Sequence, residues 1–154
     1  MKTAREAAGT VCCRAAQPAD LPALAGLGAK LWPHHTVQQR QQEFAQEMQA
    51  GAQFFLAQSA GAAIGFAQCT LRHDYVEGTS SSPVGYLEGL YVDEAFRRSG
   101  VAAALLAAAE EWARQQGCRE FASDCALENT LSQMFHQKLG FTEAARIVCY
   151  TKTL

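Results

Sequence analysis

The segment YVDEAFRRSGVAAALLAAAEEWA, residues 91–113, constrains the fold more than any other part of the chain. The apolar run 90–92 at its start predicts a strand, and the alanine-rich part from Val101 onward predicts a helix. The first turn of a helix has unpaired N–H groups with partial positive charge, and it therefore favours acidic neighbours. This helix is instead preceded by Arg97, Arg98, Ser99 and Gly100. Cations at that place cost stability unless something negative binds there, so the loop predicts an anionic ligand.

Strand and helix patterns alternate along the rest of the chain, and Asp20 is expected to cap the helix that follows it. Strands are expected at 10–15, 53–58, 63–72, 84–92, 119–123, 141–145 and 147–151, and helices at 21–31, 37–50, 101–116 and 128–139. The order β-αα-βββ-α-β-α-ββ predicts one α/β domain with a mixed sheet. Residues 1–9 are expected to be a loose leader.

Size and charge exclude several classes of protein. The 154 residues, 49% of them hydrophobic, favour a single domain with its own core. A net charge of −2 argues against a nucleic-acid partner, which requires a basic surface. No apolar run approaches the roughly 20 residues of a membrane helix, so no membrane partner is expected. The six cysteines show no metal-ligand spacing, which predicts no metal site and favours reduced thiols in a cytoplasmic protein.

The loop from Arg97 to Ala102 has the chemistry of a phosphate site. A glycine lets the backbone turn tightly and approach a ligand. The N–H groups at the start of the helix bind anions, and arginine side chains suit phosphate. A pyrophosphate is therefore the expected ligand. Taken alone, these six residues fit equally well with a charged surface loop that turns at a glycine.

The same six residues match the motif [QR]-x-x-G-x-[GA], and together with the element order they resemble the GNAT acetyltransferase superfamily. A K-L-G-F sequence ending at Phe141 is a further feature of that family. The resemblance implies acetyl-CoA as co-substrate and a sheet whose central strands splay apart. It also implies that pantetheine binds to strand backbone and pyrophosphate to loop amides. The cofactor-binding residues it implies are Leu90, Tyr91, Val92, Arg97, Arg98, Ser99, Gly100, Val101, Ala102, Ala103 and Asn129.

Four further segments resemble a narrower group, the short single-domain aminoglycoside 6'-N-acetyltransferases. They are L-W-P-H-H at 31–35, R-H-D-Y-V-E-G at 72–78, S-S-P-V…L-E-G-L-Y-V at 81–92, and F-A-S-D at 121–124. This resemblance implies direct acetyl transfer to the 6'-amine of an aminoglycoside in a ternary complex. It also implies a homodimer. The substrate-binding residues it implies are Trp32, His35, Tyr75, Glu88 and Asp124, with Glu88 as ammonium ligand or general base.

The residues themselves leave alternatives open. Glu88 interrupts an apolar strand, and because an unpaired buried charge is costly, it either faces a cleft or forms a salt bridge. Asp124 follows a strand at the edge where α/β sheets bind ligands, but it could also cap the next helix. Trp32 is either a platform for a sugar ring or a core residue beside Pro33. Tyr75 lies in a polar loop, which favours a substrate contact.

One position departs from the resemblance. Related enzymes often carry an additional acid in the strand after the G-F pair, and here Ala145 occupies that place. The departure affects the expected range of drugs more than the reaction. Two other functions stay open at this stage: acetylation of a different amine, such as a polyamine or a protein N-terminus, and a non-catalytic acyl-CoA sensor.

Overall fold

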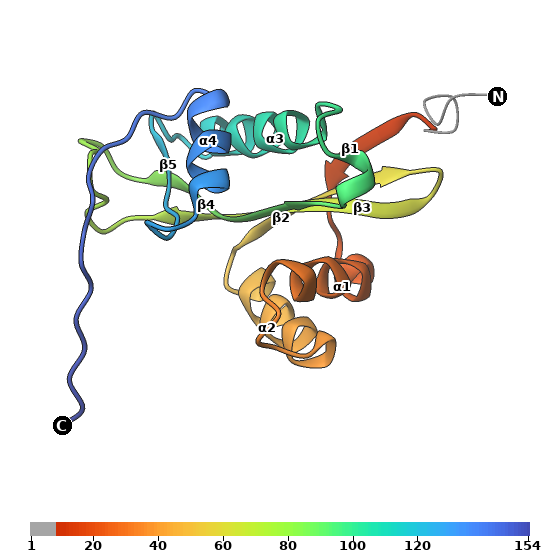
Figure 1. Ribbon diagram of the computed structural model, residues 1–154, viewed down its shortest axis with the longest axis horizontal. Coiled ribbons are helices and arrows are strands. Elements are labelled where there is room, and N and C mark those ends of the chain that lie inside the picture. Colours follow the sequence, from red (N-terminus) through yellow and green to blue (C-terminus); the bar gives the residue numbers. More distant parts are fainter. Residues whose placement is uncertain (1–8) are drawn as a thin grey trace.

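Five strands form one mixed sheet with helices on both of its faces (Figure 1). The computed structural model describes residues 9–154, so nearly all of the expected leader lies outside the described residues. The strands run in the order β1-β2-β3-β4-β5, with antiparallel pairing except between β4 and β5, which are parallel. Their bounds are β1 Val11–Ala15, β2 Gln53–Ser59, β3 Ala62–Arg72, β4 Val84–Val92 and β5 Phe121–Ser123.

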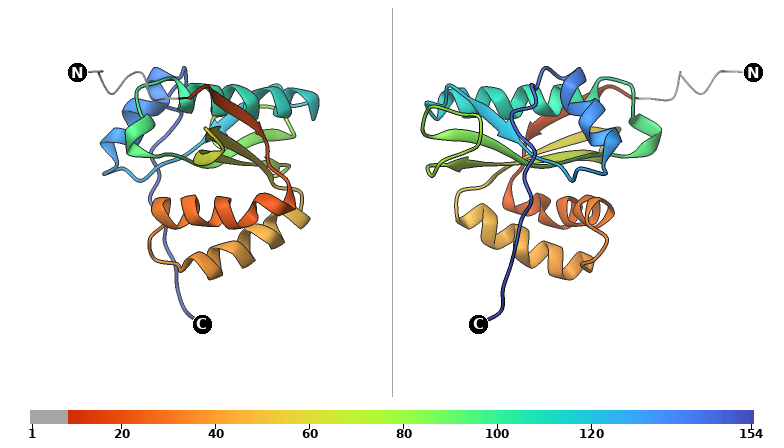
Figure 2. Two further views of the ribbon diagram at one scale, coloured as in Figure 1. Left: turned by 90° about the vertical axis from the view of Figure 1, so that its right-hand side faces the viewer. Right: turned by 60° about the vertical axis from the view of Figure 1, so that its left-hand side comes forward.

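Two helices cover each face of this sheet (Figure 2). On one face lie α1 (Leu21–Leu31) and α2 (Val37–Gln49), and on the other lie α3 (Val101–Gln115) and α4 (Thr130–Lys138). Short 3-10 turns, η1 (Pro18–Asp20) and η2 (Glu94–Phe96), precede α1 and α3. Each face has its own core: Phe44, Phe54 and Phe66 are buried on the side of α1 and α2, while Leu105 and Leu106 of α3 are buried on the other side. The predicted α/β fold with a mixed sheet is therefore confirmed.

The N-termini of α2 and α1 differ in how their capping residues are used. At α2 the Thr36 side chain accepts a hydrogen bond from the Gln39 amide, as in a capping box. Asp20 stands at the start of α1 as expected, but its carboxylate does not cap that helix. It accepts the Gln17 amide at 2.8 Å and pairs with Arg14 at 2.7 Å. Asp20 is therefore the N-cap residue of α1 as predicted, but its side chain makes no capping bond to that helix because it is bound by Arg14 and the Gln17 amide.

The C-terminal part of the chain differs from its prediction. Residues 141–145 and 147–151 form no strand, and the chain beyond Phe141 is extended and runs away from the domain (Figure 1). Strand propensity alone does not make a strand, because the backbone N–H and C=O groups need a partner strand. Within residues 9–154, β5 pairs with β4 alone, and the C-terminal segment lines a cavity beside β5 without pairing with it. None of the helices within residues 9–154 combines the length and apolar character needed to cross a membrane.

Candidate active site

The sheet opens between β4 and β5. The two strands pair only where Gly85–Leu87 meets Phe121–Ser123, after which β5 ends and β4 continues to Val92. No strand within residues 9–154 pairs with that side of residues 88–92, so their backbone groups on that edge are available to a ligand. The expected splay of the central strands is confirmed.

The loop between β4 and α3 has the backbone geometry of an anion site. Arg98 and Gly100 both have positive φ, +60° and +84°, and Gly100 stands at the N-cap without a capping side chain. The first helical hydrogen bond runs from the Ala104 amide to the Gly100 carbonyl, which leaves the three preceding amides of the helix without a helical partner. A Cβ placed on Gly100 would meet nothing within 4 Å, so the site is open. Such a turn of exposed amides suits a phosphate group.

The two arginines of this loop have different positions. Arg97 donates from Nε to the Val92 carbonyl at 2.9 Å, and its guanidinium lies 5.7 Å from the Tyr91 ring centroid. Arg97 therefore fastens the loop to the end of β4. Arg98 is exposed beside the free amides. Ser99 donates its hydroxyl hydrogen bond to the Phe96 carbonyl, within the loop itself. Arg98 therefore has no described side-chain partner, whereas Arg97 is held against the end of β4.

Glu88 is the extra residue of a bulge in β4. Gln68 pairs with Gly89 and the next residue, Cys69, pairs with Leu87, so Glu88 has no partner opposite it on β3. Its carboxylate accepts a hydrogen bond from the Thr70 hydroxyl at 2.7 Å and forms an ion pair with Arg72 at 3.0 Å. Glu88 also lines a cavity, which is described below. The sequence left open whether Glu88 faces a cleft or forms a salt bridge, and in the structure it does both.

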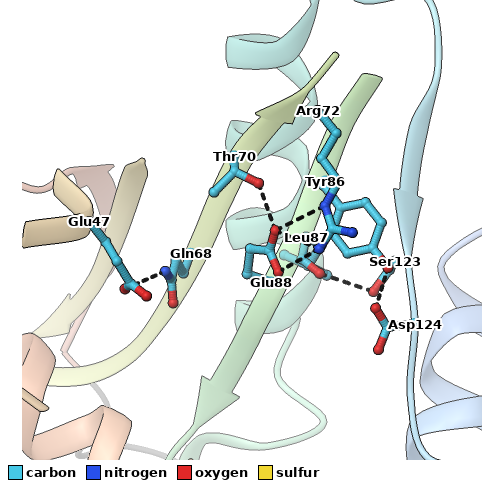
Figure 3. A network of polar contacts seen from close by, with 9 residues as sticks. All are labelled: Glu47, Gln68, Thr70, Arg72, Tyr86, Leu87, Glu88, Ser123 and Asp124. Carbon is cyan, nitrogen blue, oxygen red and sulfur yellow. Dashed lines mark hydrogen bonds and ion pairs between the residues drawn. The ribbon is translucent and has the colours of Figure 1, made fainter. Parts of the chain in front are cut away.

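A row of polar side chains continues from Glu88 toward β5 (Figure 3). The Arg72 guanidinium lies 3.4 Å from the ring centroid of Tyr86, and the Tyr86 hydroxyl donates a hydrogen bond to Asp124. Burial, together with the adjacent Asp124 carboxylate, raises the pKa of Tyr86, so the phenol stays protonated and acts as a donor. The N-cap of α4 is Asn129, which excludes Asp124 as the cap of that helix. Arg72 thus connects the two acidic residues implied by the resemblance.

Two cavities lie along this row. One, of about 670 Å³, is lined by Trp32, Glu47, Gln68, Thr70 and Glu88 among others. The second, of about 1080 Å³, is lined by β5, α4 and the C-terminal segment, and includes Tyr75, Tyr86 and Asp124. Arg72 lines the second cavity and pairs with Glu88 of the first, so the ion pair stands between them.

The remaining expected residues lie in different surroundings. Trp32 lines the first cavity and also packs edge-on against Phe44 and Phe66, so it belongs to the cavity and the core at once. A Cβ on Gly89 would collide with the Trp32 ring, which explains the glycine in L-E-G. His35 pairs with Glu43 at 3.3 Å on the surface and lines neither cavity.

Two polar residues of α4 act within the protein itself. Asn129, expected near the cofactor, accepts the Ser132 amide at the start of α4. Its side chain therefore has a structural use as a helix cap. The ring of His136 is satisfied by the Ser132 carbonyl at 2.6 Å and the Ser123 hydroxyl at 2.8 Å. This arrangement is that of a structural helix histidine.

Sequence reasoning missed four polar residues of this region. Arg72 and Tyr86 belong to the row between Glu88 and Asp124, and Glu47 and Gln68 line the first cavity. Gln68 interrupts the buried strand I-G-F-A-Q-C-T-L, the same signal that singled out Glu88. Glu47 follows the fully buried Phe44 by one helical turn, which puts it beside the buried face of α2. The partnerships of Arg72 and Tyr86 have no signal in the local sequence. Among residues 9–154, no group of three or more His, Cys, Asp or Glu side chains could hold a metal ion.

Comparison with known proteins identifies the family. The model of the "Acetyltransferase (GNAT) family" matches residues 8–141. This chain belongs to the GNAT family.

Relatives of this GNAT chain share one description. The aminoglycoside N(6')-acetyltransferase type 1 of Salmonella typhimurium is 47% identical over 128 residues, which are 82% of this chain and 88% of the relative. The protein of the same name from Stenotrophomonas maltophilia is 44% identical over 143 residues, 92% of each chain. A solved structure of aminoglycoside N-acetyltransferase AAC(6')-Iy in complex with CoA aligns with a TM-score of 0.90 at 42% identity, covering 94% of this chain and 96% of that one. A second structure of AAC(6')-Iy, with a CoA-linked acetylneamine bisubstrate analogue, aligns at 0.89, with 42% identity and coverage of 95% and 100%.

Proposed function

We propose that this GNAT protein is an aminoglycoside 6'-N-acetyltransferase that transfers the acetyl group of acetyl-CoA to the 6'-amine of the drug. One observation of the structure carries the proposal: the acidic row from Glu88 to Asp124 begins where β4 leaves β5. A polycationic acceptor held by these acids lies next to the open strand edge. The relatives named above support this choice of acceptor over a polyamine or a protein N-terminus.

The residues of the chain fit the co-substrate. The free amides and open space at Gly100 suit a pyrophosphate, and the unpaired edge of residues 88–92 suits an amide-containing arm. Acetyl-CoA supplies an acetyl thioester, which an uncharged amine can attack. A backbone N–H near Leu90, on the unpaired edge of β4, would polarise the carbonyl that is attacked. Glu88 would either bind the ammonium form of the acceptor amine or act as a base that removes a proton from this ammonium group, directly or through a water.

Transfer is proposed to be direct, without an acetylated cysteine. The cysteine next to Glu88 in the sheet is Cys69, and burial raises the pKa of its thiol to about 12, so it is not a thiolate at neutral pH. Cys125, beside Asp124, has no hydrogen-bonded base among the described contacts. A ternary complex requires no such intermediate.

Thiol release measures the proposed reaction. Free CoA is followed with acetyl-CoA and a panel of kanamycin, tobramycin, amikacin, gentamicin components, spermidine and a peptide with a free N-terminus. Rapid release with the aminoglycosides and a product acetylated at N6' by NMR is the expected result. Acetyl-CoA binding without thiol release for any amine would instead favour the sensor, and a product acetylated elsewhere would contradict the regiochemistry.

We also propose that the protein is a cytoplasmic homodimer. Six unpaired cysteines in the described part of the chain are typical of a reducing compartment. In the extended C-terminal segment, the relative exposures of Ile147, Val148 and Tyr150 are 75%, 73% and 88%. Exposing three apolar side chains so close together to water is unfavourable. The outer edge of β5 has no partner strand in the described chain. Pairing of the C-terminal segment with a second copy of the chain would bury these apolar side chains and supply a partner for the open strand edge.

Sedimentation at micromolar concentration tests the dimer. A species of twice the 16.6 kDa chain mass is expected. A monomer over the whole concentration range would contradict the proposal while leaving the acetyltransferase activity untouched.

A further inference from the structure

The carboxylate of Glu47 shares the first cavity with Glu88, yet the reaction described above does not use it. Glu47 comes from α2, on the opposite wall from β4, and its Oε2 accepts a hydrogen bond from Gln68 Nε2 at 2.7 Å (Figure 3). Gln68 is only 5% exposed, and a buried amide of this kind is stable only when it is hydrogen-bonded. The Glu47–Gln68 pair is therefore a built part of the cavity wall rather than a flexible surface contact.

Glu47 differs from the neighbouring acids because it forms no ion pair within the part of the chain that the structure describes, although Arg40 lines the same cavity. Glu88 has Arg72, and Glu43, one turn earlier on α2, has both Arg40 and His35. Among residues 9–154, no Lys, Arg or His nitrogen lies within 4.0 Å of the Glu47 carboxylate. Burial raises the pKa of Glu47, even though the hydrogen bond from Gln68 and the charge of Arg40, which lines the same cavity without pairing with Glu47, act in the opposite direction. An arriving cation would relieve this cost.

We propose that Glu47 is a specificity-determining residue that binds one ammonium group of the aminoglycoside, with Gln68 holding its carboxylate in place. The proposal rests on the proposed function, since it assumes a polycationic acceptor in the first cavity. An aminoglycoside carries several ammonium groups, and only one of them is acetylated. Glu47 and Glu88 on opposite walls can then hold different ammonium groups of one molecule, which favours drugs with amines at the matching spacing.

The variant Glu47→Gln tests this assignment, because it keeps the shape and can still accept a hydrogen bond. Its matched control is Glu43→Gln, on the same helix but outside the cavity. Steady-state kinetics are measured for kanamycin A, kanamycin B, tobramycin and neamine, and the acetyl-CoA dissociation constant is measured separately. Kanamycins A and B differ only in a hydroxyl or an amine at C2', so their comparison shows whether that amine is the one held.

Loss of one charged hydrogen bond is expected to raise KM by about 10- to 100-fold in Glu47→Gln. Both kcat and the acetyl-CoA dissociation constant should stay within about twofold of wild type, and Glu43→Gln should behave as wild type. The increase in KM should be smaller for a drug that lacks the amine held by Glu47. A second variant, Gln68→Met, keeps the charge but releases the carboxylate, and it should raise KM by less than Glu47→Gln does.

Failure of this inference is distinct from failure of the proposed function. If wild type turns over no aminoglycoside, the function itself is wrong. If wild type is active and Glu47→Gln has unchanged KM for every drug, Glu47 does not bind the acceptor. A fall in kcat with unchanged KM, or an equal effect in Glu43→Gln, would also overturn the assignment. Thermal unfolding of each variant at the wild-type temperature shows that the fold is intact.

Discussion

At the scale of single residues, the bulge at Glu88 determines which side chains meet. One additional residue on β4 reverses the alternation of faces beyond that point, and it places the carboxylate beside Thr70 and Arg72. The acid is therefore paired with an internal cation before any substrate arrives. Under the proposed function, a substrate ammonium would share Glu88 with Arg72 or take its place, so we expect the ion pair to contribute to selectivity.

Glu88→Gln keeps the shape and the acceptor for Thr70 but removes the charge. The acetyl-CoA dissociation constant should hardly change, because the anion loop is a separate part of the structure. The kcat/KM for an aminoglycoside should fall by roughly 10- to 1,000-fold. An increase in KM alone would identify Glu88 as a binding residue, and a fall in kcat as well would support a base. Glu111→Gln, on the exposed face of α3, is the control. Wild-type kinetics in Glu88→Gln would show that the acceptor binds elsewhere.

At the scale of elements, the junction of β4 and α3 combines an open strand edge with a helix start that has no side-chain cap. Gly100 adopts φ +84° at this junction, a conformation that side chains with a Cβ rarely adopt. A second glycine with nearly the same conformation, Gly117 at φ +88°, follows the other end of α3. Both positions have open space around the missing Cβ, so packing does not distinguish them.

Gly100→Val should weaken acetyl-CoA binding by about 2–4 kcal/mol, because it moves a backbone donor and fills the space that a phosphate would occupy. Gly117→Val is the matched control. Both variants should lose about 1–3 kcal/mol of folding free energy from backbone strain. Calorimetric titration with acetyl-CoA and urea unfolding separate the two effects. An unchanged dissociation constant in Gly100→Val, or an equal loss of affinity in Gly117→Val, would argue against the anion loop.

The contact between Arg14 on β1 and Asp20 before α1 makes stability depend on pH. The hydrogen bond from Arg14, supported by the Gln17 amide, lowers the pKa of Asp20 from 3.8 to about 2. A lowered pKa in the folded state adds stability above pH 4, and this stability is lost as the pH falls from about 4 to about 2.

Asp20→Asn should lose about 1 kcal/mol at pH 7, a value reduced for the partial exposure of Arg14. Urea unfolding at pH 7, 4 and 2.5 measures this difference, which should shrink toward the lowest pH. A difference that stays constant across this range would contradict the assignment to the Arg14–Asp20 pair.

At the scale of the whole molecule, charge is organised locally rather than globally. The net charge of −2 is too small to steer a polycation, but Glu47, Glu88 and Asp124 lie on one face of the sheet (Figure 3). The C-terminal segment extends beyond the domain (Figure 1), and its apolar residues Ile147, Val148 and Tyr150 are exposed.

Ile147→Ser combined with Tyr150→Ser separates a monomer from a dimer. In a monomer both side chains are exposed, and the changes should be neutral within about 0.5 kcal/mol. If they are buried against a second copy, the dimer should weaken by at least tenfold and the melting temperature should become lower and more dependent on concentration. Val37→Ser, at an exposed apolar residue on α2, is the control. Unchanged sedimentation and melting would count against a dimer built on this segment.

Local sequence patterns determined most of the secondary structure of this protein and pointed to part of its candidate site. Hydrophobic periodicity predicts the helices and the strands up to β5 nearly to the residue, because propensity and capping act over a few residues. The loop from Arg97 to Ala102 can be predicted as an anion site for the same reason, since strand, glycine and helix start are adjacent in sequence. Glu88 can also be identified as a candidate site residue from the sequence, because it is a single acidic residue within an apolar strand.

Only the tertiary structure decided which charges are paired. Glu88 is paired with Arg72, Asp124 is bound by Tyr86, and Glu47 has Gln68 but, among residues 9–154, no ion-pair partner. These partners lie 16, 38 and 21 residues apart, and sheet register and helix packing bring them together. The strands expected at 141–145 and 147–151 fail for the same physical reason. A strand exists only when a partner satisfies its backbone hydrogen bonds, and no local property of a segment says where that partner is.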